Sequence, residues 1–223
     1  MARRDSTFPT EKRGALVTPS GERTPTPVRT TDDTQRLKEA LGRLPEPWPK
    51  PVLVVLSGLP GTGKSTFARR LRERLPLLVL ETDALRKALV GEPRHTRGES
   101  NRLFAACHQL VQELLTQGIP MIFDATNLQE SHREPLYRIA EITAAKVILV
   151  QTTAPPEVVR ERLQRRQQGK SPQDNSQADW RVYQRMRLSV DPIRRDHLVA
   201  DTSIDVEPVL EKVVQEVDRW LRT

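Results

Sequence analysis

Short apolar runs alternate with amphipathic stretches along the chain from residue 52 onward. These runs have the length and composition of buried strands. They span residues 52–57, 77–81, 120–124, 145–151 and 197–201. The stretches between them repeat apolar residues with helical spacing. Alternation of this kind predicts an α/β fold, with a five-stranded, mostly parallel sheet and helices on both of its faces.

The first apolar run leads into a glycine-rich turn. The sequence VLVVLS at 52–57 has no charged residue, which suits a strand covered on both faces. GLPGTGKST at 58–66 follows directly and matches the phosphate-loop pattern of a P-loop NTPase. FARRLRERL then has the spacing of an amphipathic helix. The pattern therefore stands between a strand and a helix, which is where such a loop can cradle a phosphate chain.

Each residue type in this turn has a physical role. Glycines let successive N–H groups point into one concavity, and the helix that follows adds its positive dipole end. Lys64 is expected to reach the β and γ phosphates of ATP, and the Ser65 hydroxyl to bind Mg²⁺. ATP and Mg²⁺ are therefore the expected cofactors. The expected nucleotide-binding residues are Gly58, Pro60, Gly61, Thr62, Gly63, Lys64, Ser65 and Thr66.

Phosphate loops serve kinases, GTPases and mechanical ATPases, and the other strand ends help to choose between these classes. Asp124 ends the third apolar run, but Ala125 follows it where an efficient ATPase usually has a glutamate. The chain also has no Asn-Lys-x-Asp stretch to recognise guanine. The remaining reaction is transfer of the γ-phosphoryl group to an acceptor hydroxyl, which needs a carboxylate near the acceptor and cations near the phosphate.

The candidate catalytic carboxylate is Asp83, in ETDALRKALV just after the second apolar run. Arg86 follows three residues later, on nearly the same helical face, and can orient Asp83 or contact an acidic acceptor. The alternative is that Asp83 only caps the helix ALRKALV, although Thr82 could serve as that cap.

Asp124 is the candidate for the Mg²⁺ shell, together with Ser65, or for a pair with Arg86. A structural alternative exists for the residues after it. Asn127 and Glu130 have the spacing of a capping box for the next helix. That pattern accounts for Asn127 and leaves Asp124 available for function.

A basic segment after the fourth apolar run, PPEVVRERLQRRQQGKSP, predicts an arginine-bearing lid at about 155–175. Arg166 and Arg162 are the arginines expected to meet charge that develops in the transition state. The alternative is an ordinary solvated basic helix. Farther on, Trp180 and Tyr183 have the spacing either to stack a nucleic-acid base or to pack into the core.

The distribution of charge indicates which kinds of ligand the protein would bind. The formal net charge is +7, and residues 160–195 carry ten Lys or Arg against four Asp or Glu. This field favours triphosphate and an anionic acceptor such as a nucleic acid or a phosphorylated small molecule. The single cysteine, Cys107, falls on an apolar helical stripe and is expected in the core, and surface or capping roles are expected of the four histidines.

Composition also predicts the organisation of the chain. Residues 1–50 are expected to form a largely disordered, proline-rich tail with one helix, TQRLKEALGRL, capped by Asp32 or Asp33. Residues 51–223 are expected to form the catalytic domain. The chain has no apolar run of membrane-spanning length, which indicates a cytoplasmic protein.

Together, GLPGTGKST, TDALR, DATN and RERLQRR resemble the P-loop kinases that include the kinase domain of polynucleotide kinases and, more distantly, the zeta toxins. The resemblance implies that Asp83 is the general base, that Arg86 contacts an acceptor phosphate and that Arg166 is the lid arginine. It also implies that Asp124 supports this arrangement and that the loop in VADTS lies near adenine.

That family phosphorylates very different acceptors, so fold and reaction type transfer better than substrate. The leading hypothesis is an ATP- and Mg²⁺-dependent kinase that acts on a nucleic acid 5′-end or a small metabolite. The alternative is a nucleotide-dependent regulatory or RNA-binding protein that hydrolyses ATP slowly.

Overall fold

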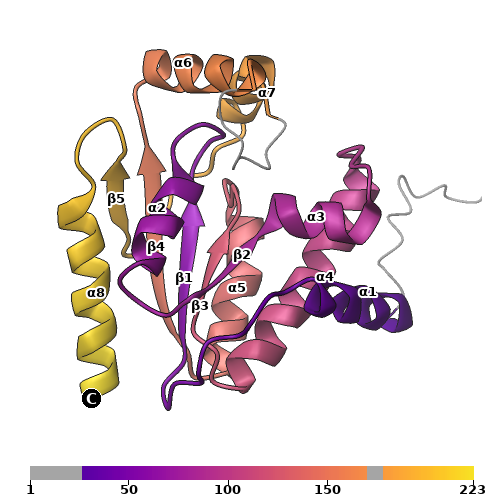
Figure 1. The fold of residues 1–223 in the computed structure, drawn as a ribbon, viewed down its shortest axis with the longest axis vertical. Helices are drawn as coiled ribbons and strands as arrows, with labels where there is room; N and C mark the ends of the chain where they lie inside the picture. Colours follow the sequence, from indigo (N-terminus) through magenta and orange to yellow (C-terminus); the bar gives the residue numbers. More distant parts are fainter. Residues whose placement is uncertain (1–26, 170–177) are drawn as a thin grey trace, which may run out of the picture.

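Five parallel strands form the central sheet in the computed structural model, which describes residues 27–169 and 178–223 (Figure 1). The strand order across the sheet is β2-β3-β1-β4-β5. The strands are β1 (Val52–Ser57), β2 (Leu78–Glu81), β3 (Met121–Asp124), β4 (Lys146–Thr153) and β5 (Leu198–Asp201). The predicted α/β fold is confirmed, and each strand lies within two residues of its predicted bounds.

Helices cover both faces of the sheet and its carboxyl edge (Figure 1). One face carries α2 (Lys64–Arg72) and α8 (Glu207–Arg222). The opposite face carries α3 (Thr82–Val90), α4 (Arg97–Thr116) and α5 (Glu130–Ile142), and α1 (Pro27–Glu39) packs outside α4. The helices α6 (Pro156–Gln167) and α7 (Trp180–Arg187) lie beyond the carboxyl ends of the strands. No helix among the described residues is long and apolar enough to cross a membrane.

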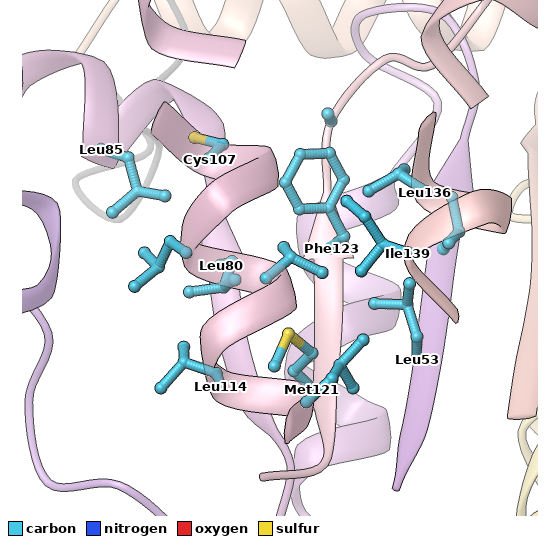
Figure 2. Close-up of a cluster of buried hydrophobic side chains, with 14 of the residues drawn as sticks. Leu53, Leu80, Leu85, Cys107, Leu114, Met121, Phe123, Leu136 and Ile139 are labelled. Atoms are coloured by element: carbon cyan, nitrogen blue, oxygen red, sulfur yellow. The ribbon is translucent and has the colours of Figure 1, made fainter. Parts of the chain in front are cut away.

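The core is divided by β1 into two apolar layers. Leu53 and Val55 face the layer under α4 and α5, whereas Val54 and Leu56 face the layer under α2 and α8. All six residues of β1 are buried, because parallel strands in such a fold are covered on both sides. The first layer, shown in Figure 2, includes Leu53, Leu80, Leu85, Cys107, Leu114, Met121, Phe123, Leu136 and Ile139.

Cys107 lies on the buried face of α4 and has no exposed surface. Burial raises the pKa of its thiol to about 12, so the side chain stays neutral. Its predicted role in core packing is confirmed.

The N-terminal helix α1 differs from its prediction. It begins at Pro27, so Asp32 and Asp33 lie inside the helix and the prediction that either of them caps it is wrong. Asp33 is buried instead, and its Oδ2 accepts a 2.5 Å hydrogen bond from Nε of Arg102 on α4. Leu37 is fully buried in the apolar layer that also holds Leu80 and Leu114. The helix α1 thus packs onto the domain that follows it. The predicted division of the chain into a tail, residues 1–50, and a catalytic domain, residues 51–223, stays a prediction.

Leu37→Ala tests whether α1 is part of the folded domain. Removing a fully buried leucine should lower the free energy of unfolding by about 2–5 kcal/mol, because it leaves a cavity against α4. Urea unfolding followed by circular dichroism would measure the change. Arg36→Ala, at an exposed position of the same helix, is the control and should have little effect. Equal stability of both variants would show that residues 51–223 fold without α1.

Candidate active site

The phosphate loop joins β1 to α2, as predicted. Gly63 precedes the first residue of α2 and has a left-handed backbone, with φ of 86°. A Cβ at this position would lie 3.0 Å from the Thr202 hydroxyl. Glycine suits this position because it adopts the left-handed backbone easily and has no side chain to crowd Thr202. Nζ of Lys64 donates to the carbonyl oxygens of Gly58 and Leu59, each at 3.0 Å. The ammonium group is thus held along the loop.

Two threonines, Thr152 in β4 and Thr202 just after β5, contact this loop. The hydroxyls of Thr62 and Thr152 lie 2.8 Å apart, and Thr202 Oγ1 donates to the Thr62 carbonyl at 2.9 Å. Sequence reasoning did not single out Thr152 or Thr202 as site residues. The available signal was their place at the carboxyl ends of β4 and β5, where parallel sheets bind ligands.

A cavity of about 860 Å³ opens between the loop and the helices α3, α4, α5 and α7. Most of the predicted catalytic and metal-binding residues line it, namely Lys64, Ser65, Asp83, Arg86, Asp124 and Arg166. Pro60, Gly61, Gly63 and Thr66 line it as well. Gly58, Thr62 and Arg162 are not among its lining residues. The fold thus brings the two predicted carboxylates to the same cavity as the phosphate loop.

The two predicted arginines of α6 have different surroundings. Arg166 lines the cavity. Arg162 instead donates to Thr202, through Nη1 to the hydroxyl and Nη2 to the carbonyl oxygen, both at 2.7 Å. Its Nη1 also lies 3.4 Å from the carbonyl oxygen of Gly61. Arg162 therefore connects α6 to the phosphate loop and to the loop after β5. Residues 170–175 of the predicted lid lie outside the described residues.

Asp83 does not cap α3. The helix begins at Thr82, with Glu81 as the preceding cap residue, so Asp83 is the second helical residue. The Thr82 hydroxyl donates to the Asp124 carbonyl at 3.1 Å, so the suggestion that Thr82 caps the helix is also wrong. Both capping alternatives fail, and Asp83 remains a half-buried carboxylate in the cavity wall.

Arg86 pairs with Glu99 of α4, a residue that sequence reasoning missed. Nη1 of Arg86 lies 2.7 Å from a Glu99 carboxylate oxygen, and the side chains are 8% and 10% exposed. Burial alone would raise the pKa of Glu99, but the Arg86 guanidinium and the Arg94 amide together lower it. The available signal was the capping pattern TRGE, in which Thr96 accepts a hydrogen bond from the Glu99 amide. Nε of Arg86 is buried without a hydrogen-bond partner in the described part of the chain.

The capping box suggested for Asn127 and Glu130 does not form in the segment after β3. The helix α5 begins at Glu130 after Gln129, so Asn127 does not cap it. Asn127 has a left-handed φ of 43°, and its Nδ2 donates to the Leu56 carbonyl at 2.7 Å. The Ser57 hydroxyl donates back to the Asn127 carbonyl at 3.0 Å. The role of Asn127 is therefore to tie β3 to the start of the phosphate loop.

A fully buried arginine extends this connection. Arg133 of α5 donates through Nη1 to the carbonyl oxygens of Asn127 and Leu128, at 2.9 and 3.0 Å. Its Nη2 reaches the carbonyl oxygens of Asp191 and Pro192, after α7, at 3.4 and 3.3 Å. The carboxylate of Asp191 in turn accepts the amide N–H of Glu130 at 3.0 Å. The segments that follow β3 and α7 are thus joined at one point.

The face of α7 that lines the cavity is not the aromatic one. The rings of Trp180 and Tyr183 stack on each other at 4.7 Å and pack against Val159 and Leu163 of α6. The residues of α7 that line the cavity are Val182, Arg185 and Met186. The core-packing interpretation of Trp180 and Tyr183 is therefore the one that the structure supports.

Aromatic rings from α4 and α5 form another part of the cavity wall. Phe104 stacks on His132, with ring centroids 5.8 Å apart and an interplanar angle of 13°. His108, one turn farther along α4, lies between Phe104 and Phe123 at 6.2 and 6.4 Å. Burial lowers the pKa of His108 to about 4, and burial followed by the charge of Arg133 lowers that of His132. His108 therefore has neither of the roles expected of the histidines, surface or cap.

The sheet order, the phosphate loop and the cavity beside it define a P-loop protein of the kinase-like group. A family model described as an AAA domain (AAA_33) matches residues 53–193, and the chain belongs to this family.

A curated relative is L-seryl-tRNA(Sec) kinase of Methanococcus maripaludis, 28% identical over 106 residues. That match covers 47% of this chain and 42% of the relative, so the chain matches less than half of the relative's length. Two solved structures share the fold. Chaetomium thermophilum Kti12 in complex with ADP-AlF3 aligns with a TM-score of 0.60 and 21% identity, covering 73% of this chain and 97% of Kti12. Mycobacterium tuberculosis APS kinase CysC in complex with AMPPNP and APS aligns with a TM-score of 0.54 and 15% identity. This alignment covers 76% of this chain and 99% of CysC.

Arg133→Met tests the junction between β3 and α7. Methionine keeps the length of the side chain but removes every donor, so buried carbonyl groups and Glu130 lose their partner. The free energy of unfolding should fall by about 3–5 kcal/mol. Arg138→Met removes a surface arginine paired with Glu134 on the same helix and should cost less than about 1 kcal/mol. Equal effects in urea unfolding would contradict a special role for Arg133.

His108 predicts a dependence of stability on pH. The unfolded histidine takes up a proton near pH 6.5, whereas the folded one does so near pH 4. The folded state should therefore lose stability as the pH falls from 6.5 to 4, by on the order of 3 kcal/mol in total. His108→Gln should flatten this part of the stability profile. An unchanged slope in His108→Gln would refute the assignment.

Proposed function

We propose that the protein is an ATP- and Mg²⁺-dependent kinase that moves the γ-phosphoryl group to an acceptor hydroxyl. The observation that carries the proposal is the position of Asp83 and Arg86 in the wall of the cavity that the phosphate loop borders. Asp83 and Arg86 offer the carboxylate and the cation that transfer to an acceptor hydroxyl needs beside the phosphate.

The nucleotide would bind along the loop, with its phosphates against the backbone N–H groups and the amino end of α2. Lys64 would turn its ammonium group from the loop carbonyls to the β and γ phosphates. Ser65 and Asp124 offer the hydroxyl and carboxylate oxygens that Mg²⁺ prefers, and both line the cavity. Bound Mg²⁺ would neutralise phosphate charge. The ADP-AlF3 complex of Kti12, which shares the fold, supports a nucleotide at this loop.

Asp83 would act on the acceptor. Its carboxylate accepts the proton of the acceptor hydroxyl as that oxygen bonds to the γ-phosphorus. The bond between this phosphorus and the bridging oxygen breaks, ADP leaves, and the proton passes from Asp83 to solvent. Arg86 would hold an anionic group of the acceptor beside Asp83, and Arg166 would offset charge on the transferring group.

For Arg162 we propose a positioning role. Its two hydrogen bonds to Thr202 and its approach to Gly61 hold α6 over the phosphate loop. The base of the nucleotide would lie near this contact, beside the loop that follows β5.

The first test is transfer of labelled γ-phosphate from Mg·ATP to a panel of nucleic acids with free 5′-hydroxyls, nucleosides, sugars and an aminoglycoside. Asp83→Asn should reduce transfer by about 10²–10⁴-fold, because the general base is lost, and leave the Kd for ATP unchanged. Lys64→Ala should reduce transfer and also weaken the binding of ATP. Asp218→Asn, at an exposed position of α8, is the control for loss of a carboxylate.

Full transfer by Asp83→Asn would show that Asp83 is not the base. ATP consumption without any labelled acceptor, at the same rate in Asp83→Asn, would overturn the kinase. That outcome would favour the alternative of a nucleotide-dependent regulatory or RNA-binding protein, whose affinity for RNA should fall steeply with salt.

A further inference from the structure

The part of the cavity wall formed by α4, α5 and α7 has a composition of its own. Its flat element is the stacked pair of Phe104 and His132. Apolar groups from α7, Val182 and Met186, complete the apolar part of the wall. Polar groups without charge are the side chains of Ser100, Asn101, Gln129 and Ser131. This wall therefore combines an aromatic surface with neutral hydrogen-bonding groups.

Charges near this wall are arranged by sign. The carboxylate of Glu99 pairs with Arg86, and that of Glu130 with Arg133. The carboxylates that line the cavity, Glu81, Asp83 and Asp124, are at or just after the ends of β2 and β3. Arg97 and Arg185 also line the cavity, and both are exposed. Two cations, one on α4 and one on α7, therefore line the same cavity as the aromatic pair, while the lining carboxylates lie at the sheet edge.

We infer that the acceptor carries a nucleobase, which stacks against Phe104 and His132 while its edge binds the neighbouring amide side chains. This inference rests on the proposed kinase function and assigns a substrate class to it. Aromatic rings bind the face of any base, and amide groups match the donors and acceptors along its edge. A phosphate attached to the same nucleoside would lie toward Arg97 or Arg185. The reacting hydroxyl would then be the ribose hydroxyl nearest Asp83.

A polyol or aminoglycoside suits this wall less well. Cationic acceptors need carboxylates, and the two glutamates beside the wall are already paired with arginines. Polyols bind through a dense set of hydrogen-bonding groups, whereas the wall presents a ring pair and aliphatic side chains beside its four uncharged polar side chains.

The nucleoside can be a free small molecule or the end of a nucleic acid, and the acceptors in the test separate these sources. Wild-type protein would be assayed at saturating Mg·ATP with cytidine, the dinucleotide CpC, a 5′-hydroxyl RNA decamer, glucose and glycerol. Transfer to cytidine alone would indicate a nucleoside acceptor. Transfer that increases from CpC to the decamer would indicate a nucleic-acid end.

Phe104→Leu keeps apolar volume but removes the ring. It should lower kcat/KM for the base-bearing acceptors by about tenfold, mainly through KM, because a stacking contact is lost. Phe104→Tyr should restore most of it. His132→Gln changes an exposed position and should act in the same direction without a folding defect, and His197→Gln is its control. The KM for ATP should not change in any of them.

Two failures can be told apart. Preferred transfer to glucose or glycerol, with Phe104→Leu within twofold of wild type, would overturn the nucleobase inference and leave the kinase intact. Transfer to no acceptor, with ATP consumed at the same rate by Asp83→Asn, would overturn the kinase. Saturation-transfer NMR with CpC would then decide the site: binding to wild type that is lost in Phe104→Leu and His132→Gln supports it, and equal binding in all three overturns it.

Discussion

The structure depends on the junction where the buried strand β1 leaves the core and becomes the phosphate loop. An apolar strand covered on both faces can end only where its last polar groups find partners. Here the Leu56 carbonyl accepts a hydrogen bond from Asn127, Ser57 donates to the Asn127 carbonyl, and the Gly58 amide donates to the Thr126 carbonyl at 2.9 Å. The loop that would hold phosphate is thus attached to the segment that carries the metal-binding candidate Asp124.

Arg133 extends this junction to the acceptor side. A charged side chain with no exposed surface is stable only if its donors are satisfied. The Glu130 carboxylate and backbone carbonyls from two segments satisfy those of Arg133. One of these segments follows β3 and the other follows α7. The aromatic wall and the cavity-lining face of α7 are therefore positioned by the same group that holds the segment after Asp124. Hydrogen bonds through Arg133 thus link the segment after β3 to the segment after α7.

Electrostatic pairing divides the arginines of the chain by role. Arg102 and Arg133 are used in structure, with Asp33 and with backbone carbonyls. Arg86 pairs with Glu99 and also lines the cavity. Paired arginines of this kind keep a fixed orientation, which suits recognition of an anionic group better than a flexible surface arginine does. Net charge alone would not distinguish these uses.

The sequence by itself determined the class of fold and the phosphate loop, because both depend on contacts close in the chain. Strand runs such as 52–57 are recognisable from apolar residues that must be buried on two faces, and the glycines and Lys64 act within one turn. The positions of Asp83 and Asp124 at one cavity followed from the rule that parallel strands end at a common edge. Arg86 followed from its helical spacing to Asp83, and Arg166 from the basic segment predicted to be a lid. Their catalytic roles remain a prediction.

Only the tertiary structure decided which groups pair across the chain. Glu99 reaches Arg86 from another helix, Thr202 holds Arg162, and Arg133 binds carbonyl groups that follow two distant elements. The spacing of Asn127 and Glu130 could not show that Asn127 bonds to Leu56 of β1. The spacing of Trp180 and Tyr183 could not show that both rings pack against α6. Local patterns report what a side chain can do, whereas packing between residues far apart in sequence determines which partner it meets.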